Sequence, residues 1–122
     1  MNLEKLVEKS DYRGFLVEAF HLPNDGVVFY LNIRPGEMRG NHFHKRKTEH
    51  FLVIHGSARI SVRDKSTDTV VHTDVGDGFP IKVSISPEHT HNITAGPRGC
   101  ICLVWCDEQF NEEDSDTYPE EI

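Results

Sequence analysis

The sequence predicts an all-β protein, a double-sheet jelly roll or small barrel, and three observations carry this prediction. Apolar and polar residues alternate with period two over 27–33, 59–63 and 81–86, the pattern of strands whose two faces differ. Turn-forming residues separate the segments at intervals of about 8 to 12 residues, as in sandwiches and barrels. The segment 100–106 is apolar on both faces, which predicts a central strand buried on both sides.

Each predicted element follows from its own residues, in chain order. A helix is expected only over 2–10, where Leu3, Leu6 and Val7 have helical spacing. The strand over 27–33 presents four apolar residues on one face, and the strand that begins at Glu49 continues through four apolar residues out of five. Turns are expected between the strands, at 23–26, 34–36, 55–57, 65–68, 74–78 and 96–99, because each is rich in Gly, Pro, Asn, Asp or Ser.

The length and charge of the chain limit its organisation and its partners. A sequence of 122 residues fits one domain, 1–122. The net charge of −7 argues against nucleic-acid binding. The acids gather in a C-terminal tail, 107–122, which holds eight acids and no Lys or Arg, so residues 1–106 carry 13 basic and 12 acidic residues. The nearly neutral body remains compatible with a phosphate-bearing metabolite, and we expect part of the tail to pack against the barrel or a second subunit.

The cysteines and the N-terminus indicate the compartment. Cys100, Cys102 and Cys106 lie in one apolar segment, and this odd number at short spacing predicts buried free thiols instead of a disulfide framework. The N-terminus has no apolar signal region, and no segment approaches the roughly 18 apolar residues of a membrane span. We therefore expect a cytoplasmic protein that binds no membrane. Apolar strand edges in so small a jelly roll favour a homodimer.

The eight histidines are unevenly placed and predict a metal site. His42 and His44 are two residues apart, so on a strand they face the same way. Glu49 begins the next strand, and His91 arrives from a third segment after Pro87. Imidazoles with one carboxylate suit Zn, Fe, Ni, Cu or Mn, and such a site usually keeps a position open for water or substrate.

At these residues the sequence resembles the cupin superfamily. The first cupin motif is matched by Gly40-Asn41-His42-Phe43-His44, then Glu49, then Gly56, with a shorter gap after the first glycine. The second motif keeps His91, but Ser86 and Glu88 stand where that motif has proline and glycine. The resemblance implies a double-stranded β-helix with the metal inside its mouth.

A narrower resemblance covers most of the chain. It is similar to the C-terminal cupin domain of bifunctional capsular-polysaccharide enzymes, and the similarity rests on segments 39–44, 47–49, 51–56, 90–93 and 104–105, Glu108, Phe110 and 116–118. In those proteins a reductase domain precedes the cupin domain, which binds zinc and epimerises carbon 3 of a UDP-linked 4-keto-6-deoxy sugar. The resemblance implies the same chemistry here. These 122 residues hold no counterpart of the reductase domain, and His50 and His89 replace an expected lysine and tyrosine.

Epimerase chemistry needs a base beside the metal and cations for the phosphates. A proton alpha to a ketone becomes removable when the enolate oxygen is stabilised, which a Lewis-acid metal does. The leading candidates for the base are Lys47 and His89, with Tyr30 and His55 as alternatives. For the diphosphate of a nucleotide sugar, Arg39 and then Arg59 or Arg63 are the candidate ligands.

Two other functions are compatible with the same residues. One is an iron-dependent dioxygenase that uses the His/Glu site. The other is a non-enzymatic sugar-binding or regulatory cupin, partnered with a separately encoded reductase. All three interpretations share the prediction of a divalent metal, with Zn favoured and Fe, Ni or Mn as alternatives.

Overall fold

The computed structural model describes residues 1–108 and 111–122, and this part of the chain is almost entirely β. Two short 3₁₀ helices, η1 (Pro23–Asp25) and η2 (Glu112–Asp114), interrupt the strands. Within the described ranges no helix is long and apolar enough to cross a bilayer. The strands are β1 (Lys9–Asp11), β2 (Gly14–His21), β3 (Val27–Ile33), β4 (Met38–Phe43), β5 (Glu49–Asp64), β6 (Thr69–Gly76), β7 (Lys82–Ile85), β8 (His89–Cys106) and β9 (Tyr118–Pro119).

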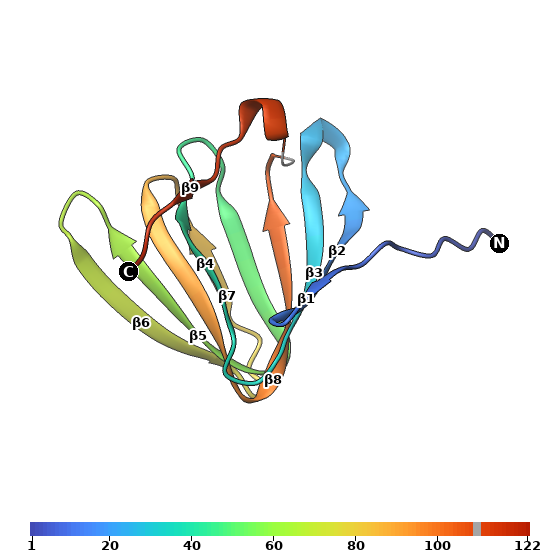
Figure 1. Ribbon diagram of the computed structural model, residues 1–122, viewed down its shortest axis with the longest axis horizontal. Coiled ribbons are helices and arrows are strands. Elements are labelled where there is room, and N and C mark those ends of the chain that lie inside the picture. The colour runs from blue at the N-terminus through green and yellow to red at the C-terminus, as the bar shows by residue number, and fades with distance from the viewer. Residues whose placement is uncertain (109–110) are drawn as a thin grey trace.

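Two long bent strands, β5 and β8, form both layers of the fold. The first part of β8 pairs with β4 and with the end of β5, whereas its last part pairs with β3 and with the start of β5. Register shifts between Val53 and His55, and between Gly56 and Ala58, mark the bend. The sheet follows the order β1-β2-β3-β8-β4-β9, with β6 and β7 attached through β5, and it curls over itself (Figure 1). This double-stranded β-helix confirms the predicted all-β jelly roll.

The core lies between the two layers and follows the predicted alternation. In β3, Val27, Leu31 and Ile33 are 1%, 6% and 1% exposed, and this strand has the bounds that the sequence predicts. The apolar segment 100–106 is the last part of β8 and lies between β3 and β5. Its three cysteines are free and buried, and burial raises the pKa of the Cys102 thiol to about 12.

The prediction of a helix over 2–10 is wrong. Residues 1–8 have no regular secondary structure, and Lys9 begins strand β1. Leu3 and Val7 are 84% and 82% exposed, and Figure 1 shows this segment leading away from the sheet. A helix this short is marginal in water unless its apolar residues are buried, and here Leu3 and Val7 stay exposed.

The end of the acidic tail lies along the barrel. Strand β9 pairs with β4, with Phe43 opposite Tyr118, and these two rings stack with centroids 5.2 Å apart. Asp116 is only 4% exposed. Phe110, which the sequence resemblance singles out, lies outside the described residues.

The bend of β5 depends on Gly56, the last glycine of the first cupin motif. Its φ is +72°, and a Cβ there would lie 2.1 Å from the carbonyl oxygen of Gly99. We expect Gly56→Ala to lower the free energy of unfolding by more than about 3 kcal/mol, because left-handed strain adds to a clash with backbone. Gly36→Ala is the control, since Gly36 has φ +74° and a Cβ there would meet no other atom within 4 Å, and should cost about 1–2 kcal/mol. Urea unfolding measures both, and equal losses would contradict the steric argument.

Candidate metal centre

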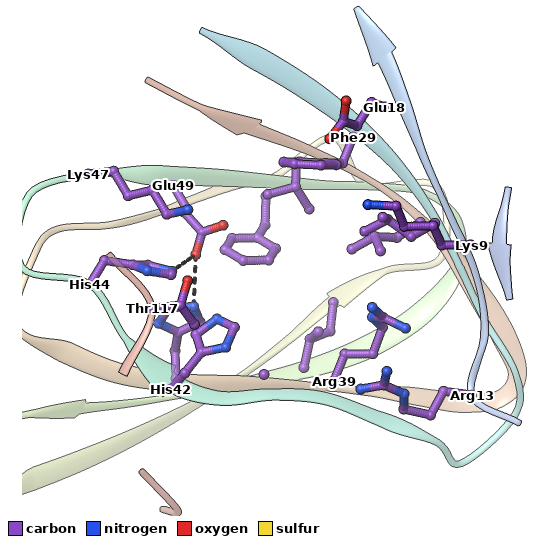
Figure 2. Close-up of a pocket in the computed structure, with 17 residues that line it drawn as sticks. Lys9, Arg13, Glu18, Phe29, Arg39, His42, His44, Lys47, Glu49 and Thr117 are labelled. Carbon is purple, nitrogen blue, oxygen red and sulfur yellow. Dashed lines mark hydrogen bonds and ion pairs between the residues drawn. The ribbon is translucent and has the colours of Figure 1, made fainter. Parts of the chain in front are cut away.

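Four side chains, three from one short segment and one from β8, meet at the mouth of the barrel. His42 lies in β4 and is the register partner of His91 in β8. His44 follows the end of β4, and Glu49 is the first residue of β5. One ligand atom from each of these residues lies within 4.8 Å of the others, and Figure 2 shows His42, His44 and Glu49 at one end of a cavity. The structure therefore brings together all four of the ligands that the sequence predicts.

The carboxylate of Glu49 is the centre of this group. Its Oε1 lies 2.6 Å from Nε2 of His44 and 3.0 Å from Nε2 of His91. On the far side of each ring, Nδ1 of His44 donates to the carbonyl of Asp116 at 2.9 Å, and Nδ1 of His91 donates to that of His89 at 3.0 Å. These outer hydrogen bonds fix the orientation of both rings, so both Nε2 atoms are directed at the centre.

The protonation states suit a metal. Burial, followed by the charges of His91 and His44, lowers the pKa of His42 to about 3, so this imidazole is neutral at physiological pH. Burial alone would raise the pKa of Glu49, but hydrogen bonds from His44 and His91 outweigh it and hold the pKa well below its ordinary value. Three imidazoles with one carboxylate form a donor set for Zn, Fe, Ni or Mn. The cluster thus fits a divalent metal site of the cupin type.

Asp116 holds the loop between His44 and Glu49 in place. Its carboxylate accepts hydrogen bonds from the backbone amides of Lys45, Arg46 and Lys47 at 2.9–3.2 Å. Burial alone would raise the pKa of Asp116, but these amides lower it below its ordinary value. Because the Asp116 carbonyl also accepts from His44, the tail orients one metal ligand and the loop that follows it.

The four ligands line a cavity of about 340 Å³. Two of the predicted substrate-handling residues also line it, Lys47 and Arg39. Lys47 is 7% exposed and lies beside Glu49, whereas Arg39 lies toward the other end of the cavity (Figure 2). The cavity therefore combines a metal-type site, a buried amine and a guanidinium.

Five of the predicted candidates do not line this cavity, namely Tyr30, His55, His89, Arg59 and Arg63. Strand geometry gives the reason for Tyr30 and Arg59. Tyr30 has the opposite parity to Phe29 and Leu31, which do line it, so its ring lies on the outer face and stacks on Phe15 at 5.9 Å. Arg59 likewise faces outward and pairs with Asp74 at 2.8 Å. The expectation that Tyr30 reaches the cavity is wrong, and the placement of Arg59 gives it no contact with a ligand bound there.

His89 also lies outside the cavity, although it is two residues from His91. Its Nδ1 donates to the carbonyl of Pro87 at 2.9 Å, and its Nε2 lies 3.7 Å from the carboxylate of Asp64. His89 begins β8, beyond its pairing with β4, and there its ring faces the end of β5. Of the two leading candidates for the base, only Lys47 lies in the cavity.

Sequence reasoning missed several polar residues that line the cavity, among them Lys9, Arg13 and Thr117. Lys9 belongs to β1, Arg13 to the β1–β2 turn, and Thr117 to the tail just before β9. None belongs to a motif, and each reaches the cavity only through pairing between segments distant in sequence. The one available signal was the resemblance at 116–118.

Fold and site together define a cupin, a double-stranded β-helix with a His₃Glu cluster in its mouth. The chain belongs to the polysaccharide biosynthesis C-terminal domain family, whose sequence model matches residues 9–118. It is 36% identical over 110 residues to a UDP-2-acetamido-2,6-beta-L-arabino-hexul-4-ose reductase of Pseudomonas aeruginosa, covering 89% of this chain and 30% of that protein.

Solved structures agree with this assignment. The capsular polysaccharide assembling protein CapF from Staphylococcus aureus superposes with a TM-score of 0.93 at 31% identity, over 98% of this chain and 34% of that one. An oxalate decarboxylase variant from Bacillus subtilis has a TM-score of 0.80 at 24% identity, over 93% of this chain and 30% of that one, and shows the fold alone. The chain spans about a third of the length of these relatives.

Removing one ligand should remove the metal. We expect His91→Ala to abolish stoichiometric divalent metal in the purified protein, because the site loses a buried imidazole that faces Glu49. Elemental analysis of the dialysed protein measures this. His89→Ala is the matched control, from the same strand but outside the cavity, and should retain the metal. Full retention by His91→Ala would contradict the ligand assignment.

Removing the Asp116 carboxylate should destabilise the protein and loosen His44. Asp116→Ala leaves three backbone amides without their acceptor, which should cost about 2–3 kcal/mol of unfolding free energy. Asp114→Ala, on the same segment, removes a 73% exposed carboxylate that pairs weakly with Arg46 at 3.4 Å and should change stability by less than about 0.5 kcal/mol. Urea unfolding compares the two, and a similar change in both would count against the anchoring role.

Proposed function

We propose that this domain is an epimerase or isomerase of a nucleotide-linked 4-keto-6-deoxy sugar in surface-polysaccharide biosynthesis. Family membership and the sugar-nucleotide relatives support the general role. The observation that carries the specific proposal is the position of Lys47, an amine 7% exposed in the same cavity as the His₃Glu cluster. A candidate base beside an electrophilic centre is the arrangement needed for proton abstraction alpha to a ketone.

The residues of the cavity divide the reaction between them. A divalent metal, which we propose to be Zn, would be held by His42, His44, Glu49 and His91 and would supply Lewis-acid polarisation of the keto oxygen. Lys47 in its amine form takes the proton from the carbon next to the ketone, and the C–H electron pair enters the enolate. Water in the cavity then supplies a proton to the opposite face of that carbon, which inverts its configuration, and the ammonium of Lys47 returns its proton to solvent.

The cytoplasmic location and the homodimer remain proposals. Support for a second copy comes from the outer face of the sheet, where Phe20, Val28, Trp105 and His50 are register neighbours across four strands. Phe20 and Trp105 are 63% and 42% exposed on this face. A flat apolar row of this kind is typical of subunit contacts.

Exchange of a substrate proton with solvent tests the proposed chemistry. In deuterated water, the metal-loaded protein should place deuterium at carbon 3 or 5 of a UDP- or dTDP-4-keto-6-deoxyhexose, detected by mass spectrometry and NMR. Lys47→Met should lower the exchange rate by about 10²-fold or more, because general-base catalysis contributes on that scale.

The controls separate loss of the base from loss of the fold. Tyr30→Phe and His89→Ala change titratable residues outside the cavity and should leave the exchange rate within about twofold of the parent. Lys47→Met should also keep the stoichiometric metal. Absence of deuterium across the whole sugar panel, in protein that holds its metal, would refute the proposed reaction.

A further inference from the structure

The cavity has a second functional end, opposite the metal centre. Lys9, Arg13 and Arg39 line it there, while His42, His44, Glu49 and Lys47 lie at the other end (Figure 2). The cations come from three places in the chain, namely β1, the β1–β2 turn and β4. Sequence reasoning predicted only Arg39 as a phosphate ligand.

Little negative charge balances these cations. Among the described residues that line the cavity, the acids are Glu49, which belongs to the metal centre, and Glu18. Glu18 lies beside Phe29 in Figure 2 and pairs with His21 at 3.3 Å. Asp11, which does not line the cavity, pairs with Arg13 at 2.5 Å. In the described part of the chain, Lys9 and Arg39 have no ion-pair partner within 4.0 Å.

Arg39 carries this unbalanced charge in a half-buried position. Burial, and then the nearby charge of Arg13, lower the pKa of Arg39, while Asp11 offsets the effect only in part. Two guanidinium groups that repel each other inside a cavity are unfavourable for the empty protein. An anion bound between them would remove that repulsion, so the arrangement favours a negatively charged ligand.

The hairpin that supplies Lys9 and Arg13 is held firmly against the barrel. A Cβ at Gly14 would lie 1.9 Å from the carbonyl oxygen of Asn32, so the hairpin lies in direct backbone contact with β3. The carbonyl of Arg13 accepts from the amide of Arg34 at 2.8 Å. Asp11 holds the Arg13 guanidinium through Nε and Nη2, which leaves Nη1 free of it. The cationic end is therefore preorganised, which favours binding.

We propose that Lys9, Arg13 and Arg39 form an anion subsite that binds the diphosphate of a nucleotide sugar while the sugar lies at the metal centre. The identity of the sugar ligand rests on the function proposed above, whereas the anion subsite rests on the cations alone. A cavity of about 340 Å³ with a metal-type site at one end and cations at the other requires a ligand with two chemically different ends. A nucleotide-linked sugar has two such ends, the sugar and the diphosphate. One guanidinium group can donate two parallel hydrogen bonds to the oxygens of a phosphate.

Binding of UDP, uridine and inorganic pyrophosphate to the full chain tests the subsite. Isothermal titration should show that Arg13→Gln and Lys9→Met each weaken UDP and pyrophosphate binding by about tenfold, the scale of one charge-assisted contact. Uridine binding should not change between parent and variants. UDP affinity should also fall as salt is raised from about 50 to 200 mM.

Two controls define the result. Arg59→Gln removes an arginine that, like Arg13, pairs with an aspartate, but outside the cavity, and it should bind UDP like the parent. In the metal-free His91→Ala protein, Lys9→Met and Arg13→Gln should still weaken UDP binding about tenfold. That result would exclude a diphosphate bound only by the metal. Lys9→Met keeps the test valid if Arg13→Gln unfolds, since exposed Lys9 has no side-chain hydrogen bond in the described chain.

The outcomes are distinguishable. Parent-like UDP binding by Lys9→Met and Arg13→Gln, or an equal loss in Arg59→Gln, would overturn the anion subsite even if solvent exchange is observed. Weakened UDP binding with unchanged uridine binding would support the subsite even if no sugar exchanges its proton. In that second case only the proposed reaction would fail.

Discussion

The buried carboxylate of Glu49 is the interaction on which the rest of the structure depends. A carboxylate that is 8% exposed would cost several kcal/mol if it were unpaired. Oε1 faces His44 and His91, and Oε2 accepts from the thiol of Cys106 at 3.1 Å. These partners lie after β4, at the start of β8 and at the end of β8, so one carboxylate links both layers. The same contacts that compensate its burial also shape a metal site.

The candidate metal centre was predictable from sequence because its geometry is mostly local. His42 in β4 and His44 just after it are two residues apart, and their ring centroids lie 4.8 Å apart, as strand parity predicts. The cupin motif fixes the number of residues to Glu49. Glu88, which stands where the second cupin motif has glycine, does not disturb the backbone. It takes a left-handed φ of +66°, and its amide donates to the carbonyl of His44 at 2.7 Å. The backbone conformation that the motif glycine provides is therefore kept without glycine, as Asn and Asp do more commonly.

The other end of the cavity was not predictable, because its residues arrive through long-range pairing. Lys9 fell within the expected helix over 2–10, and only its pairing opposite Leu16 in β2 reveals where it faces. Thr117 depends in the same way on β9 joining β4. Tyr30 was assigned to the wrong face, although the period-two pattern already placed it on the face opposite to Phe29 and Leu31. The parity of a strand is a reliable prediction, but which face lines a cavity is a tertiary property.

Charge shows why the arrangement of residues matters more than composition. The chain has a net charge of −7, which by itself argues against anionic ligands. Yet the described residues of the cavity include Lys9, Arg13, Arg39 and Lys47 against only two acids. The acidic tail turns Asp116 toward backbone amides and pairs Glu108 with Arg46 at 2.6 Å, so both acids have partners of their own outside the cavity. The electrostatic potential in a partly enclosed cavity is set mainly by the residues that line it, and here the lining residues carry more positive than negative charge.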